Sequence, residues 1–430
     1  MHRYRANRFF TVLLIIIGIK ASAQTSTVSN PTSEHENNPY SRYGIGQMSY
    51  SDNVVLQGMG DINAAFENPY EMNTANPASY SFLKFTTYEG GMYASTRTIA
   101  STDLSYQTGT ATLSYMNIGI PLGKNAGMCI GVRPVSTMFY NLADTSVTGI
   151  GQTQGIYTGS GSLNYFYIGG AYKYKSFSFG INAGYMFGQT VITTELNSID
   201  TSIKAFNSDF SQYTKIGGIY WNAGVMYEHA IKKNMLLRIG GTLSLKQSLN
   251  ASQNSYAIST YALVDSFVQD TAFAGQGVNG KIVMPMSYSL GVQLVSNDKW
   301  LLGINYAATK WTEFRSFGSS DSLADAYKIS IGGEYTPNSS NLRNYWSRVT
   351  YRGGLYFGKD EVYLMNTSLN FYGVTAGASL PFKRSTSHVH LGLDVGTLGT
   401  KSNNLIKETY IRFSAGFSFN DRWFVKRKYD

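Results

Sequence analysis

The sequence predicts an all-β protein: a transmembrane antiparallel β-barrel of about 14 strands, built from residues 84–419. Three observations carry this prediction: few charges without a long apolar run, segments of alternating polarity, and connections that are short and long in turn. Charged residues make up 14% of the 430 residues, against roughly 25% in soluble proteins. No internal run approaches the ~20 apolar residues of a membrane-spanning helix, so the class of helical membrane proteins is excluded.

The N-terminus has the features of an export signal. Arginines at positions 3, 5 and 8 precede the apolar stretch 9–19, and Ala21-Ser22-Ala23 forms a small-residue cleavage site. Residues 1–23 are therefore predicted to be a cleaved signal peptide. The polar residues 24–37 that follow are predicted to form a flexible leader.

Residues 38–83 differ from everything after them. They are rich in Gly, Asn and Pro and show no sustained period of either 2 or 3.6 residues. This composition predicts an ordered but irregular plug or cap. Beyond residue 419 the chain ends in a basic tail, residues 420–430.

Alternation is clearest in residues 177–188 and again in 407–419. In the first of these, apolar side chains occupy every odd position, and small or polar residues occupy most of the even ones. A strand places successive side chains on opposite faces, so each such segment is a strand with one apolar and one polar face. Fourteen strands are predicted, at 84–96, 110–121, 127–140, 161–174, 177–190, 217–231, 235–248, 281–296, 300–313, 326–337, 348–358, 367–382, 387–397 and 407–419.

The connections between these strands alternate in length. Short turns such as 123–126, 175–176 and 232–234 are followed by long polar stretches, which we expect to be loops, at 141–160, 191–216, 249–280 and 314–325. This is the plan of an outer-membrane barrel with both termini in the periplasm. A β-propeller would show a repeated blade signature, and none is found in the sequence.

Two short segments now carry a family resemblance. Gln57-Gly58-Met59-Gly60-Asp61, followed by Asn76-Pro77-Ala78 just before the first strand, is similar to the N-terminal signature of the FadL/TodX-type outer-membrane transport proteins. The opening NPYSRYGIG at 38–46 and the basic ending at 420–428 resemble Bacteroidota members of that group. Gly58, Gly60, Asn76, Pro77 and Ala78 are thereby marked as the motif of a hatch.

The resemblance implies a barrel in the Gram-negative outer membrane whose residues 38–83 fold into the lumen as a hatch. It also implies passive uptake of hydrophobic small molecules, of the long-chain fatty-acid kind, with outer-membrane lipids around the barrel. PorV-like barrels, which serve secretion machines, are relatives. The alternative function is therefore a non-transporting subunit of an outer-membrane secretion or assembly complex, with outer-membrane or periplasmic protein partners. A structural or adhesive surface barrel is a third hypothesis.

Aromatic and basic residues are the candidate ligand contacts. An apolar solute could be captured by hatch or loop side chains, but aromatic residues near strand ends also form the girdles of any barrel. Two lumen-facing arginines could hold a carboxylate bidentately if unpaired, or could pair with lumen acids. The candidates are Phe66, Tyr70, Met72, Tyr80, Phe82, Trp311, Phe314, Phe317, Arg352 and Arg412.

The sequence favours no enzyme, catalytic residue, metal or cofactor. His388 and His390 share a strand face, which suits either a metal or proton-sensing site or the lining of a polar lumen. The single cysteine, Cys129, excludes a disulfide framework and a thiolate zinc cluster. Basic residues lie in separate turns without a continuous face, so no nucleic-acid binding is expected.

Overall fold

The structure, a computed structural model, describes residues 37–49, 53–148, 151–199, 207–262, 267–296, 299–341, 343–383 and 385–423. The predicted signal peptide and the leader, except Asn37, lie outside the described residues, as does the tail beyond residue 423.

No helix in the described part of the chain is long and apolar enough to cross a bilayer.

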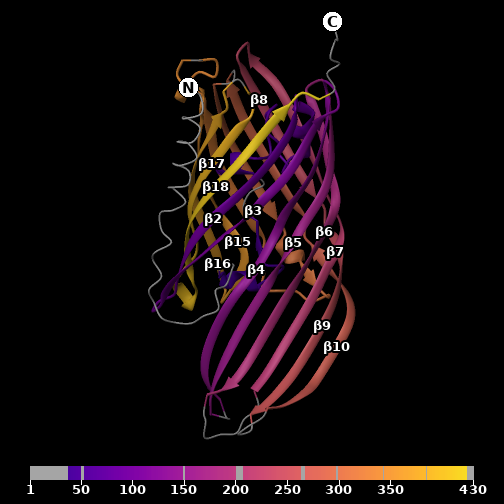
Figure 1. Cartoon of the computed structure of the whole chain (residues 1–430), viewed down its shortest axis with the longest axis vertical. Helices are drawn as coiled ribbons and strands as arrows, with labels where there is room; N and C mark the ends of the chain where they lie inside the picture. Colours follow the sequence, from indigo (N-terminus) through magenta and orange to yellow (C-terminus); the bar gives the residue numbers. More distant parts are fainter. Residues whose placement is uncertain are drawn as a thin grey trace, which may run out of the picture. The chain divides into compact units, whose positions relative to one another are not determined.

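The strands form one antiparallel sheet that closes on itself, because β18 (Lys407–Asp421) pairs along its whole length with β2 (Thr86–Ala100). The closed wall has 14 members, of which β8 and β9 together make one and β10 and β11 together make the next (Figure 1). The other bounds are β3 (Ser105–Pro121), β4 (Ala126–Thr148), β5 (Gly151–Tyr174), β6 (Phe177–Ser198), β7 (Asn207–Lys232), β8 (Met235–Ser244), β9 (Gln247–Ala262), β10 (Phe267–Met284), β11 (Ser287–Ser296), β12 (Trp300–Thr309), β14 (Ala326–Tyr335), β15 (Thr350–Leu364), β16 (Thr367–Pro381) and β17 (His388–Gly399). The predicted transmembrane barrel is confirmed.

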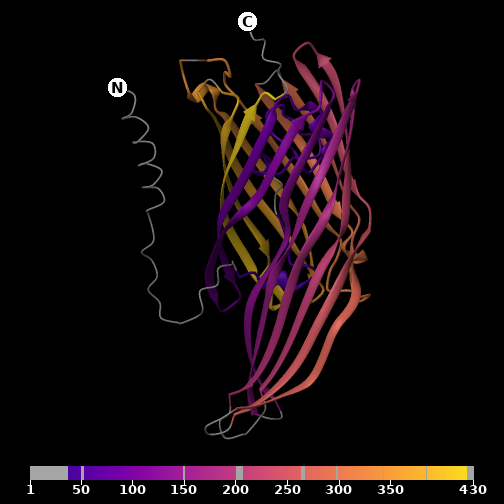
Figure 2. The ribbon, with the colours of Figure 1, turned by 45° about the vertical axis from the view of Figure 1, so that its right-hand side comes forward.

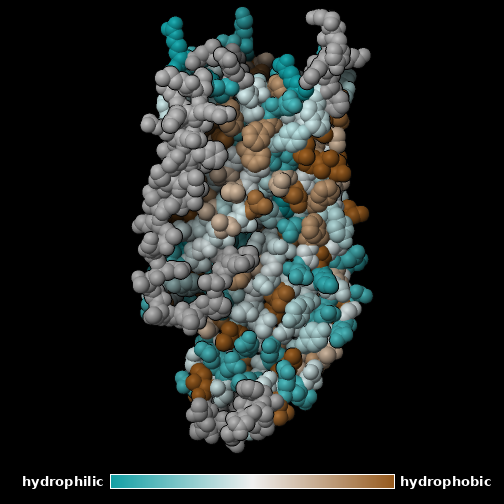
Figure 3. Space-filling view, in the orientation of Figure 1, coloured by the Kyte–Doolittle hydropathy of each residue, from teal (hydrophilic) through white to brown (hydrophobic). Residues whose placement is uncertain are grey.

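The two faces of each strand are those that the alternation predicts. On β6, Phe179 and Ile181 are 54% and 50% exposed on the outer face, whereas Ser178 and Asn182 are buried inside. Lipid rather than water covers such outer side chains in a membrane barrel. Figure 3 shows hydrophobic side chains concentrated on the upper part of the wall in that view, with more hydrophilic ones toward the lower end.

Six strands run far beyond this apolar belt. The expectation of long loops at 141–160, 191–216 and 249–280 is wrong, because nearly all the described residues there continue β4, β5, β6, β7, β9 and β10. We call these extensions the crest; they are the long strands that reach past the rest of the wall in Figures 1 and 2. The sequence concealed them because a strand with water on both faces has no reason to alternate apolar and polar residues. The stretch 314–325 does form a connection, interrupted by the two-residue β13 (Arg315–Ser316) after the turn η3 (Trp311–Glu313).

Two neighbouring wall members are broken at the same height, between β8 and β9 and between β10 and β11. At the first break the side chain of Gln247, rather than the backbone of a neighbouring strand, hydrogen-bonds the backbone of Trp221. Its Oε1 accepts from the Trp221 N–H at 2.9 Å, and its Nε2 donates to the Trp221 carbonyl at 2.9 Å. At the second break lies Pro285, which has no N–H to donate to a ladder. The wall changes direction here, where the crest begins.

The N-terminal segment, residues 37–49 and 53–83, has short elements that begin at asparagine caps. These are η1 (Pro39–Arg42), β1 (Gln47–Met48), α2 (Val54–Gln57) and η2 (Pro77–Phe82). Asn38, Asn53 and Asn76 each accept a backbone N–H of the turn that follows, and proline follows two of them in the first helical position, as helix starts favour. A further short turn, η4 (Trp346–Arg348), and η5 (Ser402–Asn404) lie between wall strands.

This segment packs directly against inward-facing positions of the wall. A Cβ on Gly180 of β6 would lie 2.4 Å from the carbonyl carbon of Pro77, and one on Gly240 of β8 would lie 1.9 Å from the Ala64 oxygen. Only glycine permits so close an approach of one backbone to another. The small residues of the inner face therefore make room for the N-terminal segment within the barrel.

Candidate functional site

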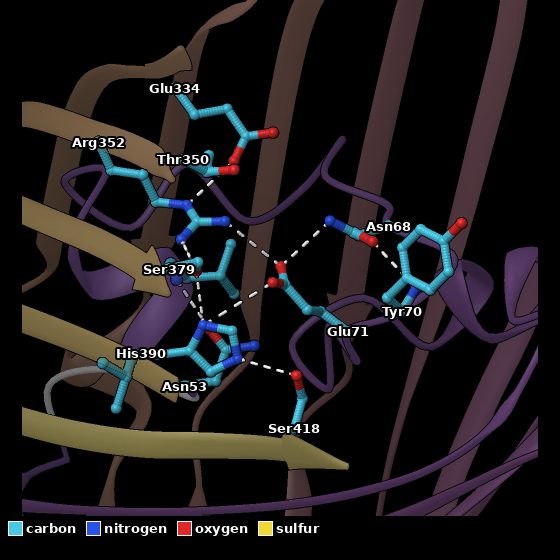
Figure 4. A network of polar contacts seen from close by, with 12 residues as sticks. Asn53, Asn68, Tyr70, Glu71, Glu334, Thr350, Arg352, Ser379, His390 and Ser418 are labelled. Carbon is cyan, nitrogen blue, oxygen red and sulfur yellow. Dashed lines mark hydrogen bonds and ion pairs between the residues drawn. The ribbon is translucent and has the colours of Figure 1, made fainter. Parts of the chain in front are cut away.

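A buried polar network fixes the N-terminal segment to one side of the wall. Glu71, which is 3% exposed, lies 3.5 Å from an Arg352 Nη atom of β15. Arg352 Nε donates to Glu334 of β14 at 3.0 Å, and the guanidinium also contacts Ser379 of β16. The side chains converge from several strands on Glu71, as Figure 4 shows. Burial raises the pKa of the Glu71 carboxyl to about 7.

His390 of β17 completes this network. Its Nδ1 lies 2.6 Å from Ser379 Oγ and its Nε2 lies 3.0 Å from Ser418 Oγ (Figure 4). The rings of His388 and His390 stack, with their centroids 6.0 Å apart. In the described part of the chain no group of three or more His, Cys, Asp or Glu side chains could hold a metal ion. The hydrogen bonds of His390 to Ser379 and Ser418 place it within the polar network of the lumen.

Other contacts hold the N-terminal segment to the remaining wall. Arg238 of β8 pairs with Glu67, and Lys328 of β14 lies 3.1 Å from Asp61. The Ala64 N–H donates to Asn305 of β12 at 3.0 Å, and the Tyr80 hydroxyl donates to Asn182 of β6 at 2.9 Å. These bonds run around the barrel, so the segment is anchored on several sides.

A cavity of about 300 Å³ lies between the N-terminal segment and the wall. One part of its lining is apolar and includes Met48, Tyr220, Met284 and Trp311. The other part is polar and includes Asp61, Lys328, Tyr356 and Asp394. Most small-molecule sites combine an apolar wall with a few placed polar groups in this way.

The wall is open between β3 and β4. These neighbours pair over only six residue pairs, from Met116 opposite Val132 to Pro121 opposite Gly127. Every other neighbouring pair of wall members, in the described part of the barrel, has at least nine. A second cavity of about 430 Å³ fills the gap, lined by Leu113, Met116 and Val132, which are also exposed on the outer surface. The opening therefore has an apolar rim.

Shared lining residues place the two cavities next to each other. Ser49 and Gln57 line both the luminal cavity and a small one of about 30 Å³, while Tyr93 and Pro134 line both this small one and the β3–β4 gap. Gln47 lines both large cavities. Its side chain contacts Asn38 and accepts from Arg97 at 3.0 Å. Gln47 thus stands between the lumen and the opening.

The structure brings only some of the predicted site residues to this cavity. Trp311 and Gly60 line it. Phe314 is buried, and its ring centroid lies 5.9 Å from that of Trp311. Met72, Tyr80 and Phe317 belong to the same apolar cluster. Phe66 is buried in a separate cluster with Leu56 and Met59.

The other candidates lie elsewhere. Tyr70 stacks on Phe85 at 5.4 Å, and Phe82 lies beneath the Lys173 ammonium at 4.1 Å. Arg352 is paired as described above, and Arg412 lies 3.1 Å from Asp394. Neither arginine is an unpaired guanidinium that awaits a ligand carboxylate.

Sequence reasoning missed Met48, Tyr220 and Met284 as cavity residues. Tyr220 is an inward-facing residue of β7, close to the first break in the wall. Met284 is the last residue of β10, at the second break. Alternation indicates which face such a residue occupies, but it does not reveal that a cavity adjoins that face.

The chain matches a family model described as BamG over residues 6–430. It belongs to the BamG family. No curated protein matches it.

Solved structures share the fold of this BamG-family chain at low identity. The Pseudomonas putida toluene transporter TodX is 16% identical with a TM-score of 0.59, covering 87% of this chain and 99% of that one. The Ralstonia pickettii toluene transporter TbuX is 14% identical with a TM-score of 0.56, covering 88% and 100%. A Pseudomonas aeruginosa FadL homologue is 12% identical with a TM-score of 0.55, covering 87% and 99%. The resemblance to FadL/TodX-type barrels is confirmed at the level of fold.

Proposed function

We propose that this BamG-family barrel lets hydrophobic small molecules cross the outer membrane by diffusion. The observation that carries the proposal is the apolar-rimmed opening between β3 and β4, whose cavity shares Gln47 with the luminal cavity as a lining residue. A solute that leaves through this opening would enter the lipid without crossing the periplasmic end of the barrel. The toluene transporters that share the fold support the proposal by analogy.

In this proposal the N-terminal segment, residues 38–83, acts as the hatch. β1 is its part nearest the opening, because Gln47 and Met48 pair with Thr137 and Ser136 of β4. Passage from cavity to gap requires this short pairing to loosen. The anchors around Glu71 and Glu67 lie on other parts of the segment, so β1 can move while they stay in place.

The test is to pin β1 to the wall with a disulfide. Met48→Cys and Ser136→Cys place two thiols at directly opposed positions. Uptake of radiolabelled toluene by a Gram-negative host carrying the variant should fall to the level of cells without the barrel, and a reductant should restore it. The matched control joins Thr397→Cys to Thr409→Cys, opposed positions of β17 and β18 within the wall. Equal uptake in the oxidised and reduced β1 variant would contradict the proposal.

A free sheet edge favours one alternative, a barrel subunit of an outer-membrane assembly or secretion complex. In the described part of the chain, residues 268–280 of β10 pair with β9 only, and Val268, Phe273 and Val278 are more than half exposed. An exposed strand edge can accept a strand of another protein. Stoichiometric protein partners after gentle extraction, together with no toluene uptake, would favour this alternative.

A further inference from the structure

We propose that the luminal cavity prefers hydrophobic amines, that is, an apolar body carrying one positive charge, and that Asp360 and Glu361 hold the charge. This inference rests on the proposed function and names a substrate class for it. It departs from the fatty-acid-like solute that the family resemblance implies.

The charged groups of the lining do not balance. Four carboxylates and two ammonium groups line the cavity: Asp61, Asp360, Glu361, Asp394, Lys328 and Lys359. Asp61 is paired with Lys328 at 3.1 Å. Asp394 is paired with Arg412 at 3.1 Å and accepts from the Tyr356 hydroxyl at 2.7 Å. The charged groups that remain are Asp360, Glu361 and Lys359, so the lining keeps an excess of carboxylates.

These two carboxylates form no ion pair with any residue in the described part of the structure. Asp360 Oδ1 accepts only the Val362 N–H, at 3.1 Å. The pairing of β15 with β16 is interrupted between Lys359 and Tyr363, so both acids lie in a bulge. Bulges next to binding sites commonly redirect side chains. Lys359 precedes both acids in the strand and lies opposite Tyr327, and both Lys359 and Tyr327 also line the cavity.

An independent observation also indicates a ligand in this cavity. Gln57 lines it and is only 8% exposed, yet its Nε2 has no hydrogen-bond partner. Buried amide groups are normally satisfied. An aromatic ring or an oxygen atom of a bound molecule would accept from this N–H. The same cavity offers Trp311, Tyr220 and Met48 to the apolar body of that molecule.

A ligand carboxylate would bind only weakly in this cavity. Arg352 and Arg412 already hold carboxylates of the chain itself. A ligand anion would meet the negative charge of Asp360 and Glu361 in the cavity, where like charges repel. An ammonium group meets two acceptors there instead, and its hydrogen bonds to them are charge-assisted.

The test compares three molecules that share a phenyl ring and a short alkyl chain: 2-phenylethylamine, 2-phenylethanol and 3-phenylpropanoate. Binding to the full-length purified protein in lipid nanodiscs is measured at pH 7 by equilibrium dialysis. The amine should bind about tenfold more tightly than the alcohol, and the carboxylate more weakly than either. In the double variant Asp360→Asn, Glu361→Gln the amine should lose this advantage while the alcohol keeps its affinity.

The matched control removes two acids far from the cavity, Asp103→Asn and Asp270→Asn, both exposed; its amine preference should equal that of the wild type. Equal affinities in the wild type, a preference for the carboxylate, or an amine preference that survives in the double variant would overturn the inference. If the alcohol still binds in any of these cases, the proposed function stands without it. If none of the three binds and toluene uptake is absent, both fail.

Discussion

Single buried carboxylates do much to determine how the N-terminal segment sits in the barrel. Glu71 and Glu67 come from the segment, and each meets an arginine of the wall, Arg352 and Arg238 respectively. Removing one partner of such a pair leaves an uncompensated buried charge, which is costly. These residues therefore act in positioning, and Arg352, which the sequence marked as a ligand contact, serves the same purpose.

The first prediction concerns Glu71 and pH. Its pKa is about 7 in the folded protein, against 4.5 as the reference for an exposed glutamate. The folded state binds the proton more tightly than the unfolded chain, so the free energy of unfolding should fall as pH rises from about 4.5 through 7. Glu71→Gln should remove this part of the pH dependence, so between pH 5 and pH 8 the difference in free energy of unfolding between variant and wild type should shift in favour of the variant by on the order of 2 kcal/mol.

Urea unfolding in lipid vesicles at pH 5, 6.5 and 8, followed by tryptophan fluorescence, measures this difference. Arg352, Glu334 and His390 are ionisable groups near Glu71, and all three are present in wild type and variant. Asp103→Asn, in an exposed turn, serves as the control and should leave the pH dependence unchanged. An identical pH profile for wild type and Glu71→Gln would refute the assignment.

At the scale of elements, the crest depends on the breaks in two wall members. β7 (Asn207–Lys232) pairs with β8 along one part of its length and with β9 along another. Between these two ladders the side chain of Gln247 bonds the Trp221 backbone as both donor and acceptor. One side chain thus satisfies backbone groups that the bend leaves without a strand partner.

We expect Gln247→Ala to destabilise the barrel by about 1–3 kcal/mol, because the N–H of Trp221 would lose the Gln247 side chain as its partner and the carbonyl would keep only the Ser244 hydroxyl. Gln253→Ala is the matched control on the same strand, since Gln253 Nε2 donates only to the neighbouring Ser255 hydroxyl; its effect should stay within about 0.5 kcal/mol. Thermal unfolding of the two variants in the same detergent distinguishes them. Equal effects would show that the bend does not depend on this side chain.

At the scale of the whole molecule, the outer face of the wall divides into a lipid-facing belt and the crest. Along β6 the exposed odd positions are apolar up to Phe187 and then continue with Gln189. The ladder to β7 crosses this boundary without interruption. The boundary is therefore one of solvent, not of secondary structure.

A charged residue on either side of that boundary should have very different consequences. Ile181→Arg, in the belt, should destabilise the folded barrel in vesicles by about 2–4 kcal/mol, whereas Gln189→Arg, on the same face of the same strand, should change it by about 0–1 kcal/mol. Urea titrations in phosphatidylcholine vesicles give both values. Similar costs at the two positions would mean that the belt extends into the crest.

The sequence predicted the strands well wherever lipid covers one face. The expected strand at 407–419 corresponds to β18 (Lys407–Asp421), and the expected start of β6 at residue 177 is correct. The far ends of β4–β7, β9 and β10 were missed because the residues of the crest have no single apolar face. Among the site candidates, Trp311 was proposed together with Phe314 and Phe317 as aromatic residues around one loop, and it lines the luminal cavity, whereas nothing in the sequence singled out Met48 and Tyr220.

The sequence alone determined that the chain forms a barrel of 14 strands and which residues face outward. Both follow from a local pattern of period 2, imposed on each strand separately by the contrast between lipid and lumen. Only the tertiary structure decided where the wall is open, where the cavity lies and which charges remain unpaired. These depend on contacts between residues far apart in the chain, such as Lys328 with Asp61 and Arg352 with Glu71, and no local pattern encodes such pairings.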